Sequence, residues 1–230
     1  MHIDLEKLSF GHADSDTRVF EEFSHRIEGP GFNALFGPSG VGKTTLARII
    51  AGEMNGFSGK VASSGLSRIL YTYNLERLPD WSGIGEHFKA VTPTSQTGFL
   101  NELTRIFGLD PYLESRYAQL SLGQQNRANL TRYLVQDFDV LIMDESLANV
   151  DEGTKKDIIL LVKKRFPDRL FLYISHNVVE VSRYCKNILV VRRPDKSPQI
   201  LTVSGFDDMG EQEPERETLE RIMLEMMNAS

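Results

Sequence analysis

Residues 37–45, with the sequence GPSGVGKTT, limit what this chain can fold into more than any other segment. They match the pattern G-x-x-x-x-G-K-[ST], the Walker A motif, whose glycines let backbone N–H groups converge on phosphate oxygens. An apolar run over 32–36 comes before the motif, and apolar residues at helical spacing over 46–51 follow it. We therefore expect a buried strand, a phosphate-binding loop and a helix over 43–52, whose N-terminus adds positive potential at the loop.

Every residue of this loop is a candidate for binding the phosphates of a nucleotide. Lys43 would bridge the outer phosphates and take part in catalysis, and the Thr44 hydroxyl would ligate Mg²⁺. The alternative is a glycine-rich turn that ends in Lys-Thr by chance, and the strand and helix predicted on either side argue against it. The candidate residues are Gly37, Pro38, Ser39, Gly40, Val41, Gly42, Lys43, Thr44 and Thr45.

A second motif, VLIMDE over residues 140–145, has four apolar residues followed by two carboxylates, which is the Walker B pattern. Ligands of open α/β sheets bind beyond the carboxyl ends of the strands. Asp144 is expected there to hold Mg²⁺ through a water, and Glu145 to polarise the attacking water as general base. The alternative, an exposed acidic turn after a strand, is disfavoured because the chain also carries the phosphate loop.

The apolar pattern of the whole chain predicts an α/β fold. Apolar runs over 138–143 and 170–174 flank a helix over 152–166, as expected for parallel strands that are covered on both faces. Two strands within 3–27, joined by a polar turn over 12–17, a strand over 68–73 and a hairpin of 187–191 with 199–203 complete the predicted strands, and 56–64 is expected to form turns.

One domain over 1–230 is expected to contain all of these elements. Its nucleotide-binding core would comprise 1–73 and 137–205, with part of the N-terminal half forming an antiparallel β subdomain. Residues 74–136 lack strand runs and show helical spacing, so we expect a helical sub-lobe inserted into the core. The tail over 206–230 is acidic and then amphipathic, and its helix is expected to pack on its own domain.

Composition excludes several other classes of protein. The net charge of −6 argues against non-specific binding of nucleic acid, and the single cysteine, Cys185, allows no internal disulfide. No apolar run approaches the length of a membrane span, and the N-terminus does not resemble a signal peptide, so a cytoplasmic location is expected.

Residues 120–124, LSLGQ, lie between the two phosphate-site motifs. Ser121 and Gln124 fit a capping box, so a helix is expected to begin here and to present a hydroxyl and free N–H groups. With the motifs in this order, the chain resembles the ATP-binding subunit of an ABC transporter, and LSLGQ resembles that family's signature motif with Leu122 in place of a glycine. The resemblance implies a P-loop NTPase core and assigns Ser121, Gly123 and Gln124 to nucleotide binding.

Further matches extend the resemblance over about residues 3–205. Residues 146–151, SLANVD, occupy the D-loop position, with Ala148 in place of serine. His176, at the end of the 170–174 run, matches the family's switch histidine, and the resemblance gives it a catalytic role. Phe10 matches the aromatic residue that stacks on adenine. A core position for Phe10 and an ordinary satisfied histidine at 176 are the alternatives.

The Q-loop of the family resembles residues 74–81, NLERLPDW, with Asn74 in place of glutamine. The resemblance implies that Asn74 approaches Mg²⁺ and the attacking water, on a stem one methylene shorter. Residues 78–81 resemble importers of the nitrate, sulfonate and taurine type. Trp81 and Phe88 would help to form an apolar groove for a membrane permease, and packing within the sub-lobe is the alternative for both.

By this resemblance the chain would hydrolyse ATP and power the transport of a solute through a separate permease, with ATP and Mg²⁺ as cofactors. It would form a head-to-tail dimer, expected to be a homodimer, at the inner face of the membrane. The alternative is an ABC ATPase that acts in a soluble or nucleic-acid-linked complex. The chain lacks the long coiled-coil insertions and tandem cassettes of that class, and a GTPase would need an Asn-Lys-x-Asp motif, which is also absent.

Overall fold

The computed structural model describes residues 1–11 and 18–230. A six-stranded sheet with the order β5-β6-β7-β3-β8-β9 forms its centre. The first five strands are parallel and β9 is antiparallel to β8, which confirms the predicted parallel pair and the predicted hairpin. The strands are β3 (Gly31–Phe36), β5 (Ile69–Tyr73), β6 (Val140–Asp144), β7 (Leu170–Ile174), β8 (Asn187–Val191) and β9 (Ile200–Ser204).

Both faces of this sheet are covered. Along β6, Val140 and Ile142 pack into one apolar cluster, while Leu141 and Met143 pack into another. Successive side chains of a strand point to opposite faces, so the two clusters lie on the two sides of the sheet. Every residue of β6 and β7 is buried, which is why the sequence shows continuous apolar runs here instead of alternation.

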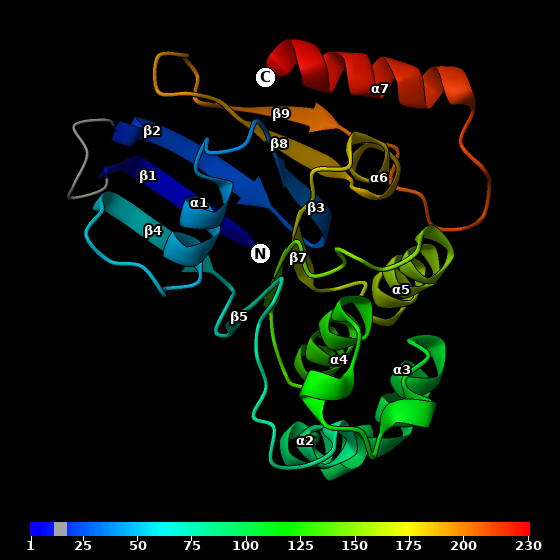
Figure 1. Cartoon of the computed structure of the whole chain (residues 1–230). Coiled ribbons are helices and arrows are strands. Elements are labelled where there is room, and N and C mark those ends of the chain that lie inside the picture. Colours follow the sequence, from blue (N-terminus) through cyan, green and yellow to red (C-terminus); the bar gives the residue numbers. More distant parts are fainter. Residues whose placement is uncertain (12–17) are drawn as a thin grey trace.

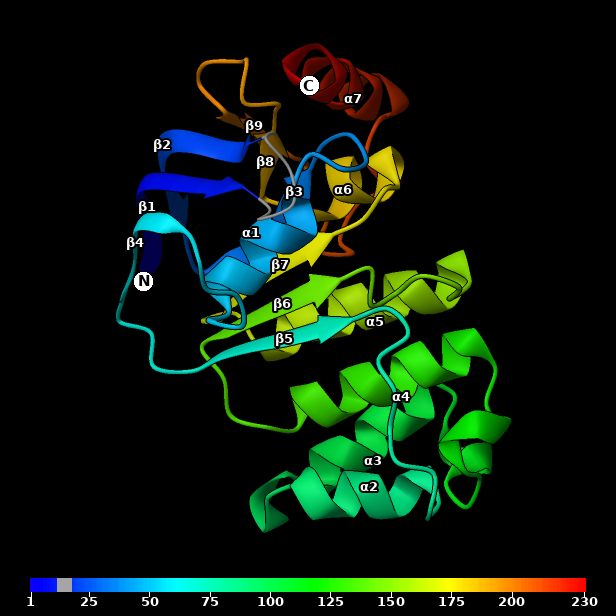
Figure 2. The same ribbon diagram turned by 60° about the vertical axis from the view of Figure 1, so that its left-hand side comes forward.

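A smaller antiparallel sheet covers one side. It has the order β2-β1-β4 and contains β1 (His2–Gly11), β2 (Arg18–Glu28) and β4 (Ser58–Ser64). Helix α1 (Lys43–Ile50) lies between this sheet and the main one (Figures 1 and 2), with Leu46, Ala47 and Ile49 buried against both. The two predicted N-terminal strands are confirmed, and the predicted turn over 12–17 lies outside the described residues.

The expectation that 56–64 forms only turns is wrong, because 58–64 is strand β4. This strand pairs with β1 through its backbone, from His2 opposite Ser64 to Ser9 opposite Ser58. Most of its side chains are exposed at the edge of the sheet. Val61 packs against the apolar cluster of the two sheets, but one valine among glycine, lysine and serine residues makes no alternating apolar pattern that sequence analysis could detect.

The helices between β5 and β6 lie together at one end of the molecule, away from the smaller sheet (Figure 2). They are α2 (Ile84–Val91), α3 (Thr97–Ile106) and α4 (Leu122–Leu134), with short 3₁₀ turns at Thr94–Gln96, Asp110–Tyr112 and Tyr117–Gln119. Phe88, Leu103 and Phe107 are fully buried between them. Their apolar cluster continues into that of the main sheet, so α4 and the sheet share one core.

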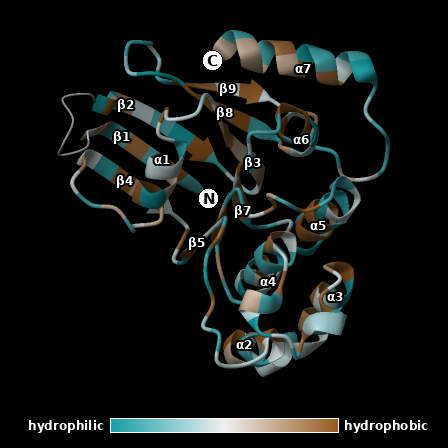
Figure 3. Ribbon diagram, in the orientation of Figure 1, coloured by the Kyte–Doolittle hydropathy of each residue, from teal (hydrophilic) through white to brown (hydrophobic). Residues whose placement is uncertain are grey.

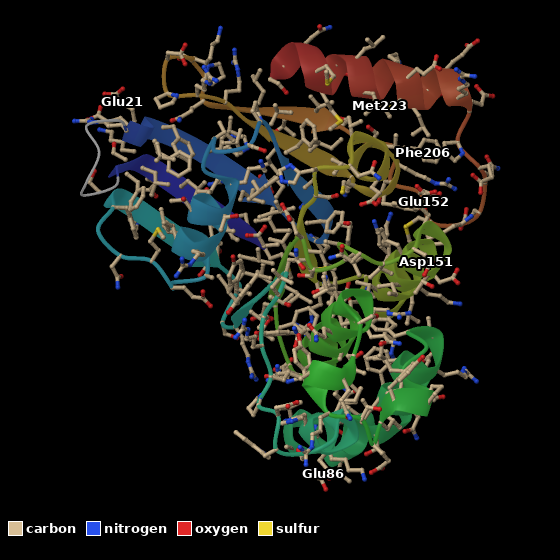
Figure 4. The ribbon with its side chains drawn as sticks, in the orientation of Figure 1. Glu21, Glu86, Asp151, Glu152, Phe206 and Met223 are labelled. Atoms are coloured by element: carbon tan, nitrogen blue, oxygen red, sulfur yellow. The ribbon has the colours of Figure 1, made fainter. Side chains whose placement is uncertain are left out.

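The remaining helices pack on the same side of the sheet as this cluster. They are α5 (Glu152–Arg165), which begins at its cap Asp151, α6 (Val178–Tyr184) and α7 (Arg216–Ala229) (Figures 1 and 4). Hydrophobic residues line β8 and β9, and hydrophilic and hydrophobic residues alternate along α7 (Figure 3). Ile222 and Met226 of α7 are buried, which confirms that the tail helix packs on its own domain.

Shortening Met226 should destabilise the fold. Its side chain is fully buried, so Met226→Ala is expected to lower the free energy of unfolding by about 2–5 kcal/mol. Met227 is 64% exposed, and Met227→Ala should change the free energy of unfolding by less than about 0.5 kcal/mol. Urea unfolding of both variants measures the difference, and equal values would contradict the docking of α7.

Candidate active site

The phosphate loop connects β3 to α1 and depends on glycine. Gly37, Gly40 and Gly42 have φ values of 147°, 78° and 104°, which residues with a side chain rarely adopt. A Cβ atom at Gly42 would lie 2.4 Å from Val19 Cγ1 and 2.8 Å from Phe20 Cζ. The glycine therefore lets the loop lie against β2, and Val41 is buried in the core beneath it.

Lys43 is held inside this loop. Its side chain is buried, and Nζ donates to the carbonyl oxygens of Gly37 at 2.8 Å and Pro38 at 2.9 Å. Burial lowers the pKa of Lys43, while the carboxylates of Glu145 and Asp144 act to raise it. The loop thus keeps a desolvated cation close to both acidic residues of the second motif.

A cavity of about 290 Å³ opens in front of the loop. One side presents the N-terminus of α1 and the Lys43 side chain, and the other presents Glu145 and His176. Positive potential on one side and an acid with an imidazole on the other suit a phosphate group that is attacked by water. The lining residues are Ser39, Gly40, Gly42, Lys43, Thr44, Thr45, Glu145, Ile174 and His176.

Glu145 and His176 form a pair at the edge of the sheet, with 2.7 Å between Glu145 Oε1 and His176 Nε2. They come from neighbouring strands, because Asp144 at the end of β6 lies opposite Ile174 at the end of β7. The Glu145 N–H also donates to the Ile174 carbonyl at 3.0 Å. Glu145 has a φ of 52°, an uncommon conformation for a residue with a side chain, which turns the chain out of the strand.

Asp144 is buried and accepts a hydrogen bond from the Tyr71 hydroxyl at 2.9 Å. Burial and the Asp144 charge raise the pKa of Tyr71 above its usual range. Mg²⁺ commonly takes one or two carboxylates together with phosphates and waters, and Asp144 with the Thr44 hydroxyl fits such a donor set. Sequence analysis missed Tyr71, since nothing in β5 indicates which strand lies beside it.

Sequence analysis also missed Glu180, which accepts hydrogen bonds from residues that come before and after His176 in the chain. Its Oε2 accepts from Tyr173 at 2.8 Å and Ser175 at 3.0 Å, and its Oε1 accepts from the Asn177 amide at 3.2 Å. Lys155 of α5 donates to the same carboxylate. Glu180 therefore holds side chains on both sides of His176. The sequence signal that could have identified it is a glutamate placed between two valines, directly after the Ser-His-Asn segment.

Asn74 does not line the cavity. It follows β5, and its N–H donates to the Asp144 carbonyl at 2.9 Å, so its backbone lies beside the acidic motif. Its side-chain oxygen accepts a hydrogen bond from Asn126 Nδ2 at 3.0 Å. Helix α4 thus engages the amide oxygen that the resemblance places near Mg²⁺, and the metal role of Asn74 stays a prediction.

The start of α4 also lies outside this cavity. Ser121 and Gln124 form the predicted capping box, with 3.3 Å from Gln124 N to Ser121 Oγ and 2.8 Å from Ser121 N to Gln124 Oε1. A Cβ atom at Gly123 would lie 2.2 Å from the Asn149 carbonyl oxygen, so the helix packs tightly on the turn after the acidic motif. The roles of Ser121, Gly123 and Gln124 in nucleotide binding stay predictions.

Phe10 is 9% exposed and packs in the apolar cluster between α1 and the two sheets. Packing in this core accounts for its burial, and its stacking on adenine stays a prediction. A second cavity, of about 220 Å³, lies at the opposite end of the parallel strands, near Gly31 and Phe171. It contains no residue of the motifs, so the phosphate chemistry is assigned to the first cavity.

The profile of the ABC transporter family matches residues 21–148, more than half of the chain. The molybdenum import ATP-binding protein ModC of Saccharophagus degradans is 30% identical in an alignment of 203 residues that covers 80% of this chain and 55% of that protein. The aliphatic sulfonates import ATP-binding protein SsuB 1 of Rhodococcus jostii is 30% identical, in an alignment that covers 82% of this chain and 79% of that protein.

The chain thus spans about half the length of the molybdenum import relative. A bacterial Atm1-family ABC exporter with ATP bound superposes with a TM-score of 0.74 at 18% identity, over 99% of this chain and 41% of that one. This likeness concerns the fold alone. Across residues 1–11 and 18–230, no helix combines the length and the apolar character needed to cross a membrane.

Two glycines of the loop should differ in their tolerance of a methyl group. Gly40→Ala adds a Cβ atom that meets nothing within 4 Å, so its cost should be the strain of a positive φ, about 1–2 kcal/mol. Gly42→Ala adds the overlap with Val19 and Phe20 and should cost about 1–3 kcal/mol more. Denaturant unfolding compares the two, and an equal loss would contradict the contact between loop and β2.

Proposed function

Because the chain belongs to the ABC transporter family, we propose that it is the ATP-hydrolysing subunit of an importer and powers transport through a separate permease. The observation that carries this proposal is the Glu145–His176 pair, which faces Lys43 across one cavity. Two relatives whose names specify import support the importer type, and no observation favours an ABC ATPase outside transport.

In this proposal the phosphate loop binds ATP. The ammonium of Lys43 and the backbone N–H groups before α1 neutralise and orient the outer phosphates, which is the main work of phosphoryl transfer. Thr44 and Asp144 would hold Mg²⁺, which supplies further neutralisation of phosphate charge when bound. Residues 1–73 and 137–205 serve as the core that holds these groups, and 74–136 as the helical sub-lobe.

Hydrolysis needs a base beside the outermost phosphate. Glu145 accepts a proton from water as the water oxygen attacks the γ-phosphorus, and the bond from that phosphorus to the β-phosphate oxygen breaks to release ADP. His176, in contact with Glu145 Oε1, orients the carboxylate. Glu180 in turn holds the residues on either side of His176.

A second copy of the chain completes the site in this proposal. Ser121 and Leu122, at the start of α4, are exposed, and Leu122 is 49% accessible. Since this helix N-terminus does not line the cavity of its own chain, we infer that Ser121, Gly123 and Gln124 serve the nucleotide of the partner in a head-to-tail homodimer.

The sub-lobe offers a surface for the permease. Leu75 is 55% exposed and Trp81 is 78% exposed, both on the connection between β5 and α2. Phe88 is fully buried, so its expected place in the groove is wrong and packing within the sub-lobe is correct. Docking of a permease at Leu75 and Trp81 would hold the protein at the inner face of the membrane.

Glu145→Gln keeps the shape of the side chain but removes the base. We expect ATP affinity within about threefold of wild type and hydrolysis slower by about two orders of magnitude or more. Calorimetry with ATP and steady-state release of phosphate measure the two effects. Lys43→Ala is the companion variant, because loss of its charge should weaken binding itself. Wild-type turnover by Glu145→Gln would refute the assignment of the base.

Trp81→Ala should reduce association with the permease without loss of stability, because the exposed indole makes little contact with its own chain. Phe88→Ala is the contrasting variant, and loss of its buried ring should cost about 3–5 kcal/mol. Co-purification with the permease and thermal unfolding together separate the effects. Unchanged association of the Trp81 variant would remove this surface from the proposal.

A further inference from the structure

Asn126 lies in the second turn of α4 and is 1% exposed. Its side-chain nitrogen donates two hydrogen bonds, to Ala148 O at 2.7 Å and to Asn74 Oδ1 at 3.0 Å. These two acceptors belong to segments far apart in the sequence. Both hydrogens of the Asn126 amide are therefore used between the core and the helix.

The Ala148 carbonyl determines the orientation of both amides. A backbone carbonyl oxygen can only accept, so Asn126 must turn its nitrogen toward Ala148. The same nitrogen then faces Asn74, which must present its oxygen in return. The side chain of Asn74 is thus oriented by the backbone of Ala148, through Asn126.

Each of the two segments adjoins the candidate active site. The Ala148 N–H donates to the Glu145 carbonyl at 2.9 Å, so Ala148 closes the turn that begins at Glu145. The Asn74 N–H donates to the Asp144 carbonyl at 2.9 Å. Asn126 therefore joins the turn after Glu145, the strand end beside Asp144 and the helix that Ser121 caps.

The same face of α4 also contacts Glu76, two residues after Asn74. Asn129 Nδ2 donates to the Glu76 carbonyl at 2.7 Å, and the Tyr133 hydroxyl donates to Glu76 Oε1 at 2.8 Å. Asn126, Asn129 and Tyr133 follow one another at helical spacing, so they lie on one side of α4. Residues 74–76 are consequently fixed to α4 along a polar interface.

We propose that Asn126 is a positioning residue that makes Asn74, the turn over 145–148 and α4 move as one unit. A shift of α4 would then displace the amide of Asn74 and the turn that carries Glu145 together. For its effect on catalysis the inference rests on the proposed ATPase function. For the coupling of the three segments it rests on the hydrogen bonds alone.

The test is Asn126→Asp in the full chain, compared with Asn129→Asp. Aspartate has the same shape as asparagine but donates no hydrogen bond, so its contact with the Ala148 carbonyl would bring two acceptors together. Asn74 would keep a hydrogen bond to this aspartate only by turning its amide so that the nitrogen donates. Asn129 is equally buried and lies one turn further along α4, but it contacts Glu76 and Tyr117 instead of Asn74 and Ala148. The control thus shares the chemical change and the burial but not the coupled segments.

Hydrogen exchange of the nucleotide-free protein is the first measurement. In Asn126→Asp, the backbone N–H groups of Asn74 and Ala148 should exchange about tenfold faster than in Asn129→Asp. The second measurement is ATP turnover, where kcat should fall by about tenfold or more relative to the control while KM stays within about threefold. Should either aspartate variant fail to fold, Asn126→Ala and Asn129→Ala carry the same comparison.

Equal exchange and equal kcat in the two variants would overturn the role of Asn126. If the wild-type protein hydrolyses ATP and this equality is found, the inference about Asn126 fails alone. If the wild-type protein shows no ATP hydrolysis, the proposed function fails, and the exchange comparison still decides whether Asn126 couples the segments.

Discussion

The parallel pairing of β3, β7 and β6 is the constraint on which the candidate site depends. Leu35 of β3 and Asp144 of β6 both lie opposite Ile174 of β7, so the three strands end at the same edge. The phosphate loop follows β3, and His176 lies two residues after the end of β7. Asp144 is the last residue of β6, and Glu145 comes directly after it. Groups that are distant in the sequence therefore face one cavity, as is usual beyond the carboxyl ends of parallel strands.

The apolar cores on both sides of the sheet make this edge rigid. Helix α1 is buried between two sheets, which fixes the phosphate loop at its N-terminus and holds Lys43 away from solvent. On the other face, α5 and α6 are joined by Lys155 and Glu180, and the same carboxylate holds the residues around His176. Packing and a buried charge network thus orient the groups that meet the phosphate.

The contact between α4 and residues 74–76 is of a different kind, because it is polar. Burial raises the pKa of Glu76, while the Tyr133 hydrogen bond and the Arg132 charge act to lower it. In the described part of the chain, Asn129 Oδ1 and Arg132 Nε are buried without a hydrogen-bond partner. The hydrogen bonds of Asn126, Asn129 and Tyr133 therefore fix α4 to residues 74–76, beside the apolar core that α4 shares with the main sheet.

The sequence by itself determined the features that depend on local spacing: the phosphate loop, the apolar parallel strands, the acidic pair after β6 and the cap of α4 at Ser121. Only the tertiary structure decided that 58–64 is a strand, that Phe10 is buried, and that Asn74 contacts Asn126. The physical reason is that spacing along the chain specifies backbone conformation and which face is apolar. The partner of a buried polar side chain depends on how segments that are distant in the sequence pack together. The local sequence around either residue does not specify that packing.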